Sequence, residues 1–330
     1  MNPPAEPARL PFLPNLSRPA LLGVLCGVIS AFGYTAANLC LRAVSHHDPL
    51  WVTAVKALPT VLLAGPWMLA DGMLGRRMLP PPRVWGAIFI AALIGQVLGN
   101  VAFQWSLGVV GMALTVPLVL GTMIVGGALL GWLVLGEPVS RRAAVSIALL
   151  VAAIVILSLG TRQAAKSPIL ADSSLLLFLG ALAAALSGIA YAFLGVVIRF
   201  GVTGQASLPA TLFTVGLVGW IILGSASLYR LGLPALLDVN PHDLQVMLPA
   251  GLRNFIAFVA LTKALQLTTV SHVNLMNASQ TAMAACLGVW LFGEPASWPL
   301  VLGVLLTIVG LVAMRRPRPK VEVVGSHVAD

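Results

Sequence analysis

The chain has 330 residues, of which 59% are hydrophobic and only 9% are charged, and its mean hydropathy is +0.98. A soluble domain carries roughly 25% charged residues, so this composition excludes a water-soluble fold and makes the lipid bilayer the main solvent. The formal net charge of +9 does not indicate nucleic-acid binding, because most Lys and Arg residues lie between apolar runs, where they act as topology signals.

Apolar stretches of about 20 residues, which can cross the hydrocarbon core as helices, recur along the chain. We therefore predict an all-α integral membrane protein with ten transmembrane helices. In chain order they are Pro19–Leu41, Pro49–Ala70, Val84–Leu107, Val110–Leu135, Ser140–Gly160, Ser173–Phe200, Leu208–Leu228, Leu244–Leu265, Val270–Phe292 and Trp298–Met314. The run after Arg18 is too long for a signal peptide, so we expect it to remain as an anchor.

The two halves of the chain resemble each other at a constant spacing of 157 positions. This offset pairs Gly23 with Gly180, Tyr34 with Tyr191, and the motif Gly136-Glu137-Pro138 with Gly293-Glu294-Pro295. Five spans per unit is an odd number, so the second unit should cross the membrane in the opposite direction, as an inverted repeat. The predicted organisation is an N-terminal arm (1–18), a first five-helix repeat (19–160), a linker (161–172), a second five-helix repeat (173–314) and a C-terminal tail (315–330).

Basic residues are unequally divided between the two sides of the predicted membrane. Twelve Lys and Arg residues fall on the side of the two termini, and only Arg42, Arg162, Lys166 and Arg230 fall on the other. By the positive-inside rule, both termini should be cytoplasmic in a cell inner membrane.

The repeated Gly-Glu-Pro motif favours a structural role at a tight helical hairpin. Gly136 and Gly293 can cap the end of a helix, Pro138 and Pro295 prevent its continuation, and a serine two residues later can begin the next span. The alternative is that Glu137 and Glu294 bind substrate or protons.

The paired motifs, the five-plus-five organisation and the length resemble the drug/metabolite transporter superfamily, specifically its EamA-type ten-helix members. The resemblance covers about Leu21 to Met314. It implies a substrate cavity near the middle of the bilayer, lined by the first four helices of each half, and many bacterial members resemble exporters of amino acids or other metabolites.

Charged groups inside spans usually face a cavity or a partner. Arg253 lies about ten residues into its span, which favours a cavity position over an error in the boundary. Lys56 lies nearer the end of its span, where a cavity position and snorkelling are equally consistent. We expect Arg253, with Lys56, to bind a carboxylate or a similar group.

Amide side chains form two stripes. Gln96, Asn100 and Gln104 follow one another at intervals of four, and Asn277 and Gln280 continue a similar pattern in the ninth span. Such stripes either line a water-filled path or hydrogen-bond neighbouring helices. We predict that they supply hydrogen bonds to the substrate.

Aromatic residues complete the predicted cavity. Tyr34 and Tyr191 occupy matching places in the two repeats, and Asn38 lies one turn beyond Tyr34. Trp105 either stacks on the cargo or anchors the span at the interface. Pro117, in the middle of the fourth span, should interrupt the helix hydrogen bonds and act as a kink or hinge.

No carboxylate is predicted at mid-membrane depth, which favours anionic, zwitterionic or neutral cargo over organic cations. Motifs for nucleotide, zinc-protease or paired-cysteine metal sites are also missing, so we expect no enzyme activity, cofactor or metal. The predicted function is a secondary exporter of a small polar metabolite, such as an amino acid, by alternating access. Its partners would be the solute, the bilayer and a coupling proton or exchanged solute. The alternatives are a lipid-linked substrate flippase, and a non-transporting membrane scaffold or lipid enzyme.

Overall fold

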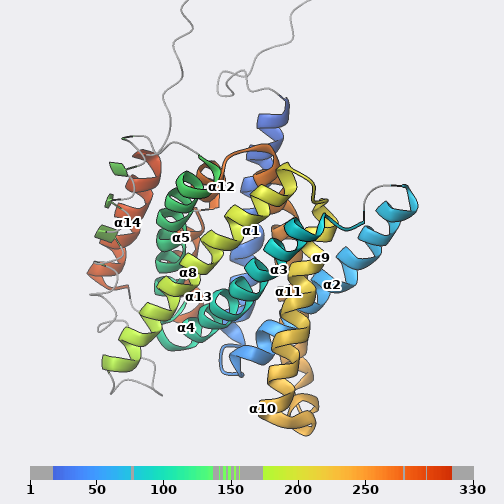
Figure 1. Ribbon diagram of the computed structural model, residues 1–330. Helices are drawn as coiled ribbons and strands as arrows, with labels where there is room; N and C mark the ends of the chain where they lie inside the picture. Colours follow the sequence, from blue (N-terminus) through green and yellow to red (C-terminus); the bar gives the residue numbers. More distant parts are fainter. Residues whose placement is uncertain are drawn as a thin grey trace, which may run out of the picture.

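The computed structural model describes residues 18–75, 78–136, 174–277, 279–294 and 296–313, and single positions or pairs between 141 and 156. Every regular element in these residues is a helix (Figure 1). Seven helices are long and apolar enough to cross a membrane, which confirms the membrane class but leaves the number of ten untested. Most of the fifth predicted span, the linker 161–172 and the tail 315–330 lie outside the described residues, as does all of the arm 1–18 except Arg18.

The first repeat begins with two long helices, and its third predicted span has three consecutive segments. Asp48 fixes the start of the second helix, because its side chain accepts hydrogen bonds from the N–H groups of Leu50 and Trp51. A π-helical turn separates the two α-helical parts of the third span. The elements are α1 (Arg18–Ala43), α2 (Pro49–Met73), α3 (Pro82–Ile94), η1 (Gly95–Val101), α4 (Ala102–Val110) and α5 (Met112–Leu135).

The second repeat follows the same order of spans, and the break between its third and fourth spans corresponds to that of the first repeat, whereas its π-helical turn lies in the second span instead of the third. Gly111, with φ +82°, separates α4 from α5, and Thr268, 157 residues later, separates α11 from α12. The matched glycines Gly136 and Gly293 both have left-handed backbones, with φ +65° and +62°. The elements are α8 (Ser174–Thr203), α9 (Leu208–Val218), η2 (Gly219–Leu223), α10 (Gly224–Leu237), α11 (Pro241–Leu267), α12 (Val270–Asn277), α13 (Ser279–Phe292) and α14 (Trp298–Ala313).

Matching helices of the two repeats cross each other in opposite directions. A Cβ atom placed on Gly216 of α9 would lie 2.8 Å from Thr60 Cγ2 of α2, and one placed on Gly65 would lie 3.2 Å from Phe213 Cε2. Residue numbers therefore rise along α2 as they fall along α9. Figure 1 likewise shows α1 and α8 running in opposite senses. This antiparallel relation is the geometry that an inverted repeat requires.

The two repeats are interleaved rather than separate. The first helix of each repeat packs against the third span of the other: α1 against α11, and α8 against α3, η1 and α4. Glycines allow the close approach, because a Cβ on Gly33 would lie 2.9 Å from Ala257 Cβ, and one on Gly180 would lie 2.8 Å from Val109 Cγ1. The apolar core consequently lies between the repeats.

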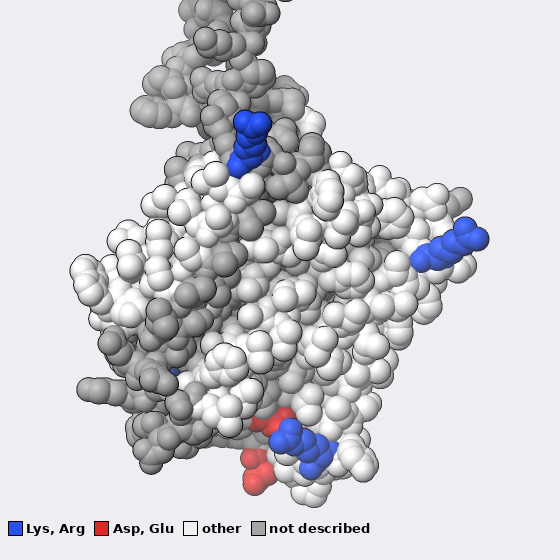
Figure 2. All heavy atoms as spheres, turned by 60° about the vertical axis from the view of Figure 1, so that its left-hand side comes forward, with Lys and Arg blue, Asp and Glu red and all other residues white. Residues whose placement is uncertain are grey.

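Charged side chains are scarce on the molecular surface. In Figure 2 the described Lys, Arg, Asp and Glu residues appear near the ends and at one edge of the visible face, and a broad uncharged region lies between them. Exposed large apolar side chains are frequent on the long helices, among them Phe32, Leu62 and Phe178. Such a surface is stable in contact with lipid and would be unfavourable in water.

Candidate functional site

A cavity of about 150 Å³ lies where the two repeats meet, and we call it the central pocket. Its lining comes from α1, α2, η1, α4 and α5 of the first repeat and from α8, α9, α11, α12 and α13 of the second. Apolar side chains provide most of the wall. The polar lining residues are Tyr34, Asn38, Lys56, Thr60, Gln96, Asn100, Tyr191, Asn254, Asn274, Asn277 and Gln280.

One polar group in the pocket is centred on Asn100, which lies in η1. The Asn100 Oδ1 atom accepts hydrogen bonds from the ammonium of Lys56 and from the hydroxyl of Tyr191, the latter at 2.7 Å. Its Nδ2 donates to Gln96 Oε1 at 2.6 Å, and Gln96 Nε2 donates to the Val215 carbonyl at 2.8 Å. This network joins α2 and η1 of the first repeat to α8 and α9 of the second.

A second polar group is centred on Asn277 at the end of α12. Its Oδ1 accepts hydrogen bonds from Ser30 Oγ of α1 at 3.2 Å and from Gln280 Nε2 of α13 at 3.0 Å. Asn274, one turn earlier, also lines the pocket. The two polar groups come from non-equivalent positions of the repeats, so the pocket is chemically asymmetric although the surrounding helices are related by pseudosymmetry.

Among the described residues that line the central pocket, Lys56 is the one basic residue and none is acidic, and Lys56 is only 4% exposed. An ammonium has three donors, and Asn100 takes one of them. Within the described part of the chain, no carboxylate lies at ion-pair distance from Lys56. The ion pairs found there involve Arg42, Arg230 and three histidines instead. A buried ammonium without a carboxylate partner is costly unless other groups compensate its charge.

The structure brings most of the predicted substrate residues together. Eight of them line the central pocket: Tyr34, Asn38, Lys56, Gln96, Asn100, Tyr191, Asn277 and Gln280. This grouping is a matter of placement, and their contact with a substrate stays a prediction.

Three predicted substrate residues lie elsewhere. Arg253 is on the exposed side of α11, where its Nη1 lies 3.4 Å from Cys40 Sγ of α1, so the predicted cavity position is corrected. Gln104 is buried between helices and donates to the Leu41 carbonyl at 3.0 Å. Trp105 packs, partly buried, against the apolar cluster that includes Leu107 and Val110.

η1 explains why the stripe predicted in the third span divides. Residues at intervals of four share a face only on a regular α-helix. A π turn is wider, so Gln104, which follows η1, faces in a different direction from Gln96 and Asn100 within it. α11 contains no such turn, and its polar residue in the pocket is Asn254 rather than Arg253, the position that matches Gln96.

Pro117 is buried inside α5, which the structure describes as one helix from Met112 to Leu135. Its neighbour Val116 lines the central pocket. A role of Pro117 as a hinge stays a prediction.

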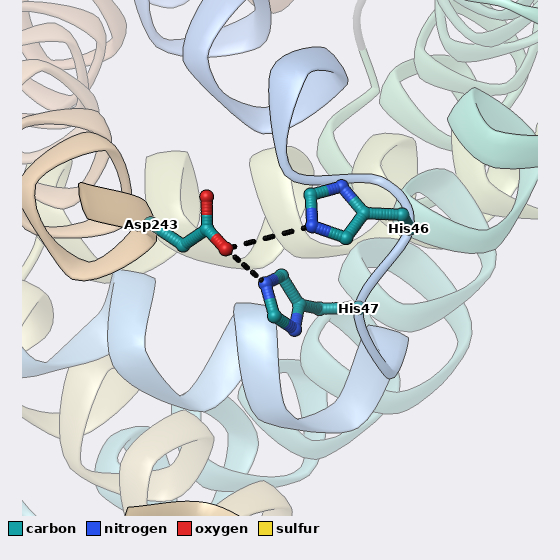
Figure 3. A group of neighbouring side chains, drawn as sticks. All are labelled: His46, His47 and Asp243. Carbon is teal, nitrogen blue, oxygen red and sulfur yellow. Dashed lines mark hydrogen bonds and ion pairs between the residues drawn. The ribbon is translucent and has the colours of Figure 1, made fainter. Parts of the chain in front are cut away.

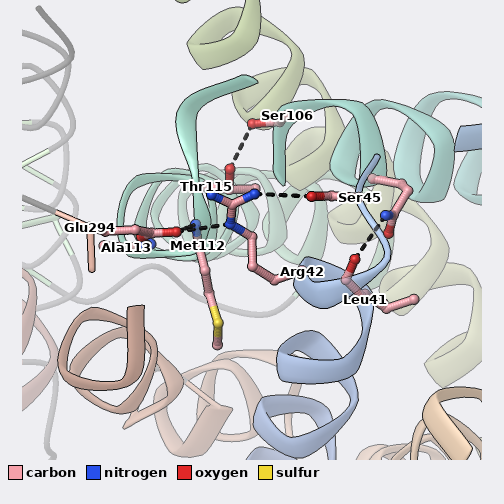
Figure 4. Close-up of polar contacts among 9 residues, drawn as sticks. Leu41, Arg42, Ser45, Ser106, Met112, Ala113, Thr115 and Glu294 are labelled. Atoms are coloured by element: carbon pink, nitrogen blue, oxygen red, sulfur yellow. Dashed lines mark hydrogen bonds and ion pairs between the residues drawn. The ribbon is translucent and has the colours of Figure 1, made fainter. Parts of the chain in front are cut away.

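Glu294 has a structural contact that extends far beyond its local turn (Figure 4). Its carboxylate accepts hydrogen bonds from the N–H groups of Met112 and Ala113, each at 2.7 Å, and from Arg42 Nε at 3.0 Å. The second repeat thus caps the first turn of α5 in the first repeat, where helix N–H groups have no intrahelical partner. Glu137, Pro138 and Pro295 lie outside the described residues.

Sequence reasoning did not assign three polar residues of the pocket to the site, namely Asn254, Thr60 and Asn274. Asn254 had a detectable signal in the sequence, because its spacing from Phe258, Leu261 and Leu265 places all four residues on one helix face. In the structure this face lines the pocket. The contact between Glu294 and Arg42 had a weaker signal in the sequence. Arg42 and Arg199 are separated by the same 157 positions as the two Gly-Glu-Pro motifs.

The fold and the pocket define a class of protein: a helical membrane protein of two interleaved repeats that enclose a mainly apolar pocket with two polar groups. The chain belongs to the EamA-like transporter family, which matches it twice, over residues 19–159 and 178–316. This confirms the resemblance noted from the sequence and makes the protein a multi-pass membrane transporter by family.

Solved structures share the fold. One, described only as "Crystal structure of protein", has a TM-score of 0.62 and 17% sequence identity, and the match covers 88% of this chain and 95% of that one. At this identity the likeness concerns the fold alone. No curated protein matches the chain.

Proposed function

We propose that the protein is a secondary transporter that exports a small anionic or zwitterionic metabolite, such as an amino acid, across the cell inner membrane. The observation that carries this proposal is the buried amine of Lys56 in a pocket whose described lining residues include no carboxylate. The negative group of the solute would accept hydrogen bonds from the Lys56 ammonium and gain from its charge.

The size and asymmetry of the central pocket support a small solute with two different ends. A volume of about 150 Å³ is below the roughly 300–1,000 Å³ typical of sites for drug-sized ligands. The Lys56 group would hold the anionic end. Amide oxygens of Asn274 and Gln280 would accept hydrogen bonds from an ammonium or a hydroxyl at the other end.

The antiparallel repeats support alternating access, because two similar units packed against each other can exchange their conformations around a common site. In this proposal both termini are cytoplasmic. The end of the molecule at which α1 ends then faces outward. The Glu294 contact with Arg42 and α5 would help to close that end while the pocket is open to the cytoplasm.

Purified protein in sealed vesicles tests the proposal. We expect saturable movement of a labelled amino acid or small organic acid, and we expect Lys56→Met to reduce it at least about tenfold, because a charge-assisted hydrogen bond contributes roughly 1.5–3 kcal/mol. Lys56→Arg, which keeps the charge, should retain part of the activity. Lys263→Met is the matched control, since Lys263 lies outside the pocket and bonds to Gln266.

Three results would contradict the proposal. The first is transport of organic cations but not of anions or zwitterions, and the second is wild-type transport by Lys56→Met. The third is movement of lipid-linked molecules alone, which would favour the flippase alternative.

A further inference from the structure

At the end of the molecule opposite the start of α1, three potential metal ligands from both repeats converge (Figure 3). His46 and His47 lie in the turn between α1 and α2, and Asp243 lies in the first turn of α11. The Asp243 Oδ2 atom is 2.9 Å from His47 Nε2 and 3.6 Å from His46 Nε2. One ligand atom from each of the three residues lies within 4.8 Å of the other two.

We propose that His46, His47 and Asp243 bind a divalent transition-metal ion of the zinc type. In a tetrahedral zinc site the ligand atoms lie about 2.0–2.2 Å from the ion and therefore roughly 3.3 Å from one another. The two distances to Asp243 fall on either side of this value, so a small rotation of the imidazoles would complete the site. Water would take the fourth position, as in other zinc sites with three protein ligands.

The chemistry of the ligands selects the ion. Two imidazoles and one carboxylate suit zinc, copper or nickel, whereas magnesium and calcium prefer oxygen ligands throughout. One negative charge from Asp243 and two neutral imidazoles leave a bound divalent ion with a net positive charge. Protonated imidazoles cannot be ligands, so binding should weaken as the pH falls.

The three side chains differ in exposure, so that an ion can reach the site from solvent while two of its ligands are held in place. The side chain of His46 is 61% exposed, which leaves the ion a route from solvent, and those of His47 and Asp243 are 22% and 18% exposed. Asp243 is positioned by the start of α11, where its N–H donates to the Asn240 carbonyl at 2.9 Å and the Asn240 side chain accepts from the His242 N–H.

A bound ion would connect the turn between α1 and α2 in the first repeat to α11 in the second. If this end must open during transport, zinc should slow transport by holding the two repeats together. This consequence rests on the proposed function, whereas metal binding itself does not.

The test is zinc binding to the purified, metal-free full chain in detergent, produced without a histidine tag and measured by competition with a chromophoric chelator. We expect one zinc ion per chain, an increase in melting temperature with zinc, and no competition by millimolar magnesium or calcium. His46→Ala and Asp243→Asn should each weaken binding at least about tenfold.

His242→Ala is the matched control. His242 is the next histidine to the cluster, with 78% of its side chain exposed and its Nδ1 3.7 Å from Asp243 Oδ1, and its removal should leave zinc affinity within about twofold. The exposed position of His46 means that His46→Ala should fold normally, which its melting temperature without zinc will verify.

The proposal is refuted if zinc does not bind saturably, because the three residues then form only an ion pair between histidine and aspartate. It is also refuted if His46→Ala binds zinc as the unchanged protein does, or if His242→Ala weakens binding as strongly. None of these results depends on transport, so they leave the proposed function unaffected.

Discussion

Replacing Glu294 by alanine should destabilise the folded protein more than any other single change of an acidic side chain in the described residues. The carboxylate is only 9% exposed and accepts three hydrogen bonds, from Met112 N, Ala113 N and Arg42 Nε. Its removal leaves two helix N–H groups without their acceptor and a largely buried guanidinium without its charge partner. Removing one partner of a buried ion pair lowers the free energy of unfolding by about 3–5 kcal/mol, and loss of a helix cap lowers it by about 0.5–2 kcal/mol.

The assay is thermal unfolding of the purified protein in detergent. The two losses together are about 3.5–7 kcal/mol, and at roughly 2 °C per kcal/mol for a chain of this size, Glu294→Ala should lower the melting temperature by about 7–14 °C. Glu294→Gln keeps one oxygen acceptor and should lower it by roughly half as much. Asp238→Asn is the control, since Asp238 is an exposed residue at the end of α10 and should change little.

A double-mutant cycle decides whether the contact is the cause. Arg42→Ala in the Glu294→Ala background should cost much less than Arg42→Ala alone, because the two side chains share one interaction. Additive losses, or a melting temperature for Glu294→Ala within about 1 °C of the unchanged protein, would refute this account of the cap.

Three further substitutions test the central pocket. Tyr191→Phe removes the 2.7 Å hydrogen bond to Asn100, and a loss of about 0.5–1.5 kcal/mol should weaken apparent solute affinity about three- to tenfold in vesicle transport; unchanged affinity would contradict it. Gly219→Ala introduces a Cβ 2.6 Å from the side chain of Gln96 and should cost about 1–3 kcal/mol in unfolding, whereas the control Gly224→Ala, with nothing within 4 Å, should be neutral. Arg253→Gln should leave transport intact in the same vesicles, and its loss would restore Arg253 to the site.

The sequence was sufficient to predict the helices because hydrophobic length is a strong signal in a membrane protein. The start of α2 at Pro49 and the break between α11 and α12 near Thr268 agree with the predicted spans to within a few residues. The repeat was also detectable, since a constant offset survives in glycines that permit close helix packing, such as Gly23 and Gly180.

The pocket was only partly predictable, because its geometry depends on a feature without a clear sequence signal. η1 alters the direction of the residues that follow it, so the interval of four placed Gln96 and Asn100 correctly but not Gln104. The π turn in the third span of the first repeat has no counterpart in α11, so the two repeats are not symmetric here. The prediction for Arg253 assumed that matching positions face the same cavity, and this assumption fails at that position. The depth of Lys56 in its span did not decide between a cavity position and snorkelling. Lys56 lines the pocket from α2, which packs closely against α9 of the other repeat.

The cap on α5 has a consequence for how the chain is made. Its acceptor, Glu294, is 182 residues further along the chain than Met112, so most of the second repeat must be synthesised before those N–H groups acquire their partner. Until then the newly inserted first half holds an incompletely bonded helix start. Assembly in the membrane should therefore finish late, and a ribosomal product that stops before residue 294 should be a substrate for quality-control proteases.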